Sequence, residues 1–172
     1  AACGALKPSE ELCVSLLKKV VSPGISSNVT ECLAAAVAFM CRQRTLSGNG
    51  SQAKAFHDEL GHSDRVCSLL ILGLRTRVER KIELPQQYFL AASIMLLSGP
   101  HKRQTAAEEL YRDSAPVRSL DTLTSMVSLL SSWELMEFHT KEYIGASLWS
   151  MSQNSENCKL LNKVAIVKHL LT

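Results

Sequence analysis

Three segments of the 172-residue chain repeat one pattern of small and large apolar residues. They are Leu33–Cys41 (LAAAVAFMC), Leu90–Ser98 (LAASIMLLS) and Ile144–Ser152 (IGASLWSMS). Each begins with an aliphatic residue, continues with small residues, and ends with large apolar residues before a final small one. Small residues allow helices to approach one another closely. Internal repetition of this kind predicts an array of similar units that pack on their neighbours.

The sequences that flank the three segments also repeat. Each segment is followed by a short amphipathic stretch: QAKAFHDEL, TAAEELYRDS or SENCKLLNKV. A further helix is expected to open with DRVCSLL, APVRSLDTL or AIVKHLL, and we align Val66, Val117 and Val167 in these openings. The N-terminal SEELCVSLLKKVV matches the helix expected before the first copy. Because core positions and helix order recur together, we predict one helical unit repeated along the chain.

Glycine and proline residues separate the expected helices at Pro23-Gly24, Gly48-Asn49-Gly50 and Gly99-Pro100. Aromatic residues make up only 5% of the chain, and alternating strand patterns are nearly absent, so we predict an all-α fold. The expected units comprise residues 8–47, 51–99 and 104–153, with a partial unit at 155–172. Together they form a single domain over residues 1–172, in which Val37, Ile94 and Leu148 are equivalent core residues.

The C-terminal stretch EYIGASLWSMSQNSENCKLLNKVAIVKHLL resembles the end of one armadillo repeat followed by the start of the next. That family shows a helix of the form A-x-x-A-L-x-N-L-S, a pair such as E-N, a short helix, and then G-A-I-x-x-L-x-x-L-L. The matching residues are Ala146, Leu148, Met151, Ser152, Glu156-Asn157, Ala165-Ile166 and Leu170-Leu171. The resemblance implies a divergent armadillo or HEAT-like protein: a right-handed α-solenoid of about three units, forming a fragment of a larger array. The copies lie further apart than the about 40–47 residues usual for such repeats, so we expect extended second helices.

The resemblance also implies where a partner binds. In armadillo proteins the third helix of each repeat lines a concave face, and that helix corresponds to the three repeated segments. Nuclear-import adaptors of the family grip an extended peptide with Trp and Asn side chains on this helix. The Asn-equivalent positions here are Phe39, Leu96 and Ser150, and alanines replace the tryptophans, so a basic localisation peptide is not expected.

A groove lined by Phe39, Met95, Leu96, Trp149 and Ser150 suits an apolar peptide or an amphipathic helix instead. We therefore expect a protein–protein interaction scaffold. The alternative is that these side chains belong to the core.

Basic residues form a second candidate site, a rim beside the groove. It comprises Arg42, Arg44, Arg75, Arg77, Lys102 and Arg103. Such a rim suits an acidic segment of a protein partner, the phosphate backbone of a nucleic acid, or simply a solvated edge. No aromatic residues interleave with the basic ones, which disfavours single-stranded nucleic acid. A chromatin-associated or nucleic-acid-associated repeat protein remains the alternative function.

The stretch HDELGH places His57, Asp58 and His62 together, as in a metal hydrolase. Two zinc-binding histidines on one helix face lie four residues apart, whereas His57 and His62 lie five apart with Gly61 between them. We expect a turn between helices there, and keep a metal-dependent enzyme as the less favoured alternative. The chain contains no nucleophile-elbow, P-loop or dinucleotide motif. We therefore expect no enzymatic activity, cofactor, metal or small-molecule substrate.

The longest apolar runs, SLLILGL and YFLAASIMLL, are shorter than the about 20 residues needed to span a membrane, so no membrane partner is expected. The six cysteines form no C-x-x-C motif, and four of them lie in apolar helical patterns. Free cysteine behaves there as a small apolar residue. We expect an intracellular protein of the cytoplasm or nucleus.

Overall fold

The computed structural model describes residues 9–42, 59–81, 84–99 and 115–164. Helix accounts for 84% of these residues and none of them lies in a strand, which confirms the all-α prediction. Residues 59–62 are helical as well. The named elements are α1 (Glu10–Val21), α2 (Ser27–Arg42), α4 (Asp64–Glu79), α5 (Leu84–Ser98), α6 (Leu120–Ser128), the 3₁₀ helix η3 (Leu129–Leu135), α7 (Phe138–Ser152) and α8 (Ser155–Lys163).

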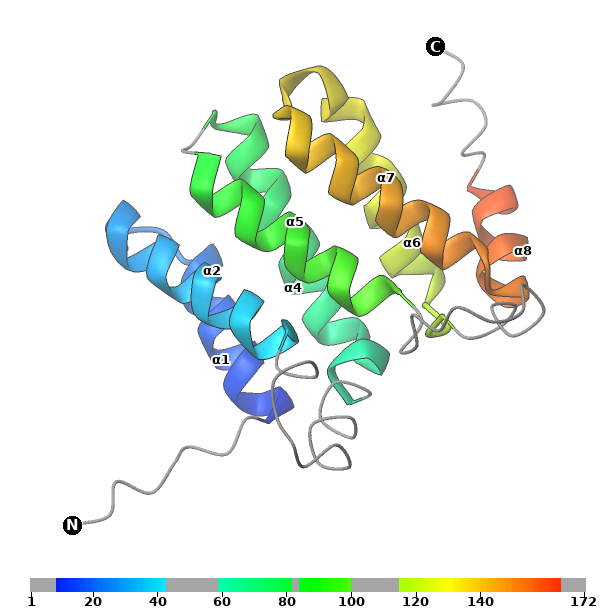
Figure 1. The fold of residues 1–172 in the computed structure, drawn as a ribbon, viewed down its shortest axis with the longest axis horizontal. Coiled ribbons are helices and arrows are strands. Elements are labelled where there is room, and N and C mark those ends of the chain that lie inside the picture. Colours follow the sequence, from blue (N-terminus) through cyan, green and yellow to red (C-terminus); the bar gives the residue numbers. More distant parts are fainter. Residues whose placement is uncertain (1–8, 43–58, 82–83, 100–114, 165–172) are drawn as a thin grey trace.

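The helices form two rows (Figure 1). In the front row α5 lies between α2 and α7, and in the back row α4 lies between α1 and α6. Two helix pairs pack across the rows, α1 on α2 and α4 on α5, while η3 packs on α4 and α8 contacts both α6 and α7. The three repeated segments are thus the C-terminal parts of the three front-row helices.

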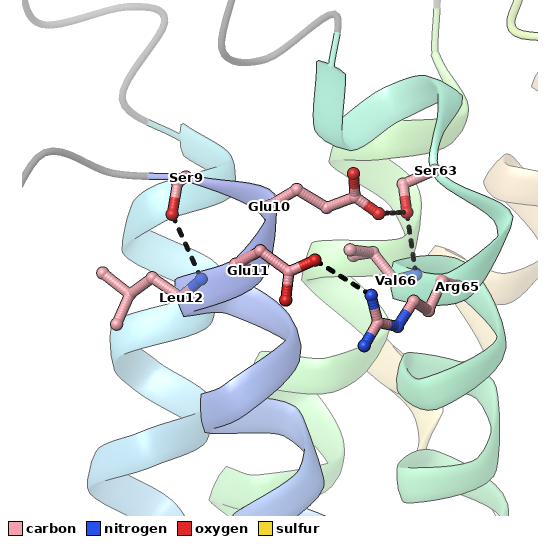
Figure 2. A network of polar contacts seen from close by, with 7 residues as sticks. All are labelled: Ser9, Glu10, Glu11, Leu12, Ser63, Arg65 and Val66. Atoms are coloured by element: carbon pink, nitrogen blue, oxygen red, sulfur yellow. Dashed lines mark hydrogen bonds and ion pairs between the residues drawn. The ribbon is translucent and has the colours of Figure 1, made fainter.

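Serine N-caps fix the start of each back-row helix. Ser9 Oγ accepts a hydrogen bond from the backbone N–H of Leu12, and Ser63 Oγ accepts one from Val66 (Figure 2). Ser119 does the same for Thr122 at the start of α6. These bonds satisfy backbone donors that a helix start leaves unpaired.

The caps correct the alignment of these helices. Val117 lies two residues before the cap Ser119 and is 54% exposed, whereas Val66 lies three residues after the cap Ser63 and is fully buried. The expected equivalence of Val66 with Val117 is therefore wrong, because the helix begins later than the apolar pattern indicates.

The core lies between the two rows. Val37, Ile94 and Leu148 are all buried, as expected for equivalent core positions. The middle front-row helix, α5, is apolar around much of its circumference because α2, α4 and α7 all pack against it. Buried side chains of the other helices complete one continuous core.

Two asparagines attach α8 to the rest of the domain. Asn154 Oδ1 caps α8 by accepting from the N–H groups of Glu156 and Asn157. The fully buried Asn157 accepts from the Arg118 N–H at 2.8 Å and donates to the Pro116 carbonyl at 2.9 Å. The E-N pair that carried the family resemblance therefore includes a residue that joins α8 to the segment before α6.

Within the described ranges, no helix has the length and apolar content required to cross a membrane.

Candidate interaction surface

One side of the front row is covered by no other described helix, and we call it the front surface. Its residues recur in register along the three helices, since each helix contributes positions separated by four and then three residues. The set comprises Glu31, Ala35 and Ala38 on α2, Tyr88, Ala92 and Met95 on α5, and Glu142, Ala146 and Trp149 on α7. All nine side chains are exposed or half-buried.

The middle of the front surface is built from alanines, and its larger side chains stand beside them. Ala35, Ala92 and Ala146 occupy the same register position on the three helices. Tyr88 is 42% exposed and Trp149 is 62% exposed, while Met95 is half-buried. A strip of small residues flanked by large apolar ones offers complementary area to an incoming apolar side chain.

Tyr88 is a surface residue that sequence reasoning missed. The Tyr143 hydroxyl donates a hydrogen bond to the Tyr88 hydroxyl at 3.1 Å, and the two rings meet edge to face with centroids 5.4 Å apart. This hydrogen bond raises the pKa of Tyr143. Tyr88 precedes the repeated segment by two residues, so the match among the three copies did not extend to it.

The expected groove residues separate into two groups. Met95 and Trp149 belong to the front surface. Phe39, Leu96 and Ser150 occupy the next register position, which turns toward the preceding helix of the row. Leu96 accordingly packs against the core and Ser150 is buried, so the expectation that Ser150 lines an open groove is wrong. Phe39 is 55% exposed because no described helix precedes α2 in the row.

The expected basic rim is corrected at Arg77, which is 6% exposed. Its guanidinium donates to the Val20 carbonyl at 2.6 Å, the Gly73 carbonyl at 3.0 Å and Gln86 Oε1 at 2.8 Å. Gln86 in turn donates to the backbone and side chain of Ser27. Arg77 thus links α4 to α1 and α5, and through Gln86 to α2, and burial lowers its pKa. Its role is structural, because a partner on the surface cannot reach it.

The remaining basic residues do not form a continuous rim in the part of the chain that the structure describes. Arg75 is exposed and pairs with Glu79 at 2.8 Å on the same helix. It also borders a hollow of about 70 Å³ between α4 and α6, which is too small for a metabolite. Arg42 is exposed at the end of α2. Arg44, Lys102 and Arg103 lie outside the described residues.

The candidate metal residues are only partly described. His62 is exposed, and it ends the helical residues 59–62 just before the cap Ser63. Gly61 lies within that helical stretch instead of terminating it, while His57 and Asp58 lie outside the described residues. Among the residues that are described, no three His, Cys, Asp or Glu side chains are grouped to hold a metal ion.

Three cysteines lie in the core of the first two helix pairs. Burial raises the pKa of Cys13 to about 12 and also raises the pKa values of Cys41 and Cys67. Their thiols therefore stay protonated at neutral pH and are poor nucleophiles. Cys32 and Cys158 are exposed.

Comparison with known proteins gave no significant match to any protein-family model, curated protein or solved structure.

Proposed function

We propose that the chain is a right-handed α-solenoid of armadillo-like units and acts as a non-enzymatic protein–protein interaction scaffold. Its partner is an apolar peptide or an amphipathic helix that binds along the front surface. The exposure of Trp149, which belongs to the same front surface as Ala146, Ala92 and Met95, is the observation that carries this proposal. A tryptophan that is 62% exposed on a helix of a packed domain is costly to leave in water, and tryptophan is enriched among the residues that anchor interfaces.

The arrangement of the helices supports the array. The front-row helices repeat one register of buried and exposed positions, and the back-row helices repeat one type of cap. Adjacent helices of a row pack directly on each other, as in repeat proteins whose units contact only their neighbours. The charge on the front surface is sparse, with Glu31 and Glu142 near the N-terminal ends of their helices. A basic residue at one end of the bound helix would complement them.

The experiment is a selection of displayed helical peptides against the immobilised chain, followed by calorimetric titration of the selected peptide. We expect Trp149→Ala and Met95→Asp each to weaken binding by at least about tenfold, since buried aromatic anchors contribute disproportionately to interfaces. Leu72→Ala is the control, because Leu72 is a large apolar residue that is 50% exposed but lies on α4 in the back row, away from the front surface. Equal losses for Trp149→Ala and Leu72→Ala would contradict the proposal, provided that circular dichroism shows both variants folded.

A further inference from the structure

A second exposed apolar stripe lies on α2, away from the front surface. It comprises Val29, Cys32, Ala36 and Phe39, whose spacing of three, four and three residues places them on one helix face. Val29 is 50% exposed and Phe39 is 55% exposed. The stripe carries no charge, and all four of its residues are exposed on a helix that packs with α1 and α5 on its other sides.

The same positions in the next two front-row helices are contact positions. The repeat alignment matches the stripe with Gln86, Phe89, Ser93 and Leu96 on α5 and with Thr140, Tyr143, Ser147 and Ser150 on α7. All eight are buried or half-buried. Gln86 donates to Ser27 of α2, Ser93 lies beside the Cys41 thiol of α2, and Tyr143 contacts Tyr88 of α5. The stripe on α2 is therefore the position at which each later front-row helix packs on its predecessor.

The back row shows a corresponding interaction at its N-terminal ends. Ser63, the cap of α4, donates from its hydroxyl to Glu10 Oε1 of α1 at 2.6 Å, and Arg65 pairs with Glu11 at 3.0 Å (Figure 2). One unit along, the Ser119 N–H and the Thr122 hydroxyl both donate to the Asp64 carboxylate. In both cases an acidic residue directly after one cap accepts a hydrogen bond from the start of the next helix in the row.

The first cap, Ser9, lacks this interaction within the described part of the chain. Its Oγ accepts from the Leu12 N–H, as Ser63 accepts from Val66, but no described carboxylate accepts its hydroxyl hydrogen. Among the described residues, the stripe on α2 and the cap of α1 both lack the partners that their equivalents have.

We propose that this side of α1 and α2 binds one more helical hairpin, from outside residues 9–172, stacked in the register in which α4 and α5 stack on α1 and α2. The front helix of that hairpin covers Val29, Cys32, Ala36 and Phe39 with small and aliphatic side chains. Its back helix carries Asp or Glu directly after the N-cap, and this carboxylate accepts the hydroxyl hydrogen of Ser9. The proposal rests on the repeated architecture proposed above, but not on partner binding at the front surface.

A second copy of this chain fits the stripe less well. The last back-row helix that the structure describes is α6, and Leu120 directly follows its cap Ser119, where Glu10 and Asp64 follow the earlier caps. A second copy stacked on Ser9 through α6 and α7 therefore brings no carboxylate to that position.

The test uses the chain's own first unit as the probe. A tandem chain, residues 1–62 followed by residues 9–172, places a second α1–α2 hairpin ahead of Ser9 and repeats the natural junction between His62 and Ser63. In this chain Glu10 of the added unit is placed to accept from the original Ser9. We expect one cooperative unfolding transition with a higher midpoint and a steeper denaturant dependence than the single chain, since more surface is buried.

The controls are two substitutions at adjacent positions of the original α2. Ala36→Glu places a charge in the stripe and should abolish the gain in midpoint, whereas Ala35→Glu places the same charge on the front surface and should retain it. Equal effects of the two substitutions would overturn the proposal. So would an added hairpin whose amides show no protection from hydrogen exchange. A wild-type single chain that dimerises in sedimentation equilibrium, and does not when Ala36→Glu is introduced, would replace the partner hairpin with a second copy.

The carboxylate interaction has its own readout. In the tandem chain the substitution is made at the original Ser9, which follows the added unit. Ser9→Ala should lower the unfolding midpoint more there than in the single chain, because only the tandem chain loses the bond to Glu10 of the added unit as well as the cap. Equal losses in the two chains would refute this interaction. Binding of the peptide selected for the front surface, measured on the same chains, separates a failure here from a failure of the proposed scaffold function.

Discussion

Arg77 on α4 donates a hydrogen bond from Nη2 to the carbonyl oxygen of Val20 on α1 at 2.6 Å. Replacing it leaves that carbonyl and Gln86 Oε1 buried without their donor. We expect Arg77→Ala to lower the free energy of unfolding by about 3 kcal/mol, as for other losses of buried hydrogen bonds to a charged group. Urea denaturation followed by circular dichroism measures this loss.

The matched control for Arg77 is Arg75→Ala on the same helix. Arg75 forms an exposed i,i+4 pair with Glu79, and its loss should change the free energy of unfolding by less than about 0.5 kcal/mol. If both variants lose the same stability, Arg77 does not have the structural role that its contacts indicate.

The part of the fold that the sequence predicted depends on local spacing. Val37, Ile94 and Leu148 are buried because each lies among small residues that bring neighbouring helices close, and this pattern is written within nine residues of chain. The same local argument identified the three front-row helices, whereas Trp149 was expected to be a contact residue because of the armadillo resemblance. Local patterns were sufficient wherever a residue's environment is set by its own helix.

The rest depends on which helices become neighbours. Arg77 on α4 bonds to Val20 on α1 and to Gln86 on α5. These partners lie on other helices, so the spacing within α4 did not indicate them, and the Arg77 side chain was expected on the surface. Phe39 and Ser150 occupy one register position, yet Phe39 is exposed and Ser150 is buried, because α5 precedes α7 in the front row whereas no described helix precedes α2. No pattern within a single helix distinguishes these cases.

Asp64 joins two back-row helices through one carboxylate. It accepts from the Thr122 hydroxyl at 2.9 Å and from the Ser119 N–H at 3.2 Å, so Asp64→Ala should reduce the free energy of unfolding by about 1–2 kcal/mol. Thermal denaturation with and without the substitution tests this. Asp121→Ala, at an exposed position in the first turn of α6, serves as the control and should have a smaller effect. A larger loss at Asp121 would contradict the role assigned to Asp64.

The buried thiols predict a specific dependence on alkaline pH. The pKa of Cys13 is raised from 9.0 to about 12 in the folded chain, so its contribution to stability is complete below about pH 9 and is lost as the pH rises toward 12. We expect the free energy of unfolding to decrease over this range, and to decrease less in a Cys13→Ala variant. Cys158→Ala, which removes an exposed thiol, is the control for the loss of a cysteine side chain. An identical alkaline slope for wild type and Cys13→Ala would contradict the assignment.

The same burial predicts which thiols react. At pH 8 iodoacetamide should modify Cys32 and Cys158 in the folded chain, while Cys13, Cys41 and Cys67 should react only after denaturation. Mass spectrometry of the digested protein identifies each modified cysteine. Fast modification of Cys41 under native conditions would show that the first helix pair opens readily.

Leu148 and Trp149 are adjacent on α7 but face opposite environments, and this difference separates a core role from a surface role. Leu148 is 8% exposed, so Leu148→Ala should lower the free energy of unfolding by about 2–4 kcal/mol through lost apolar contact and a residual cavity. Trp149 is 62% exposed, and Trp149→Ala should lower it by less than about 1 kcal/mol while weakening peptide binding. Denaturation should therefore show the larger effect for Leu148→Ala, and peptide titration should show the larger effect for Trp149→Ala. If Trp149→Ala destabilised the chain as much as Leu148→Ala, the tryptophan would belong to the core, and the front surface would lose its anchor.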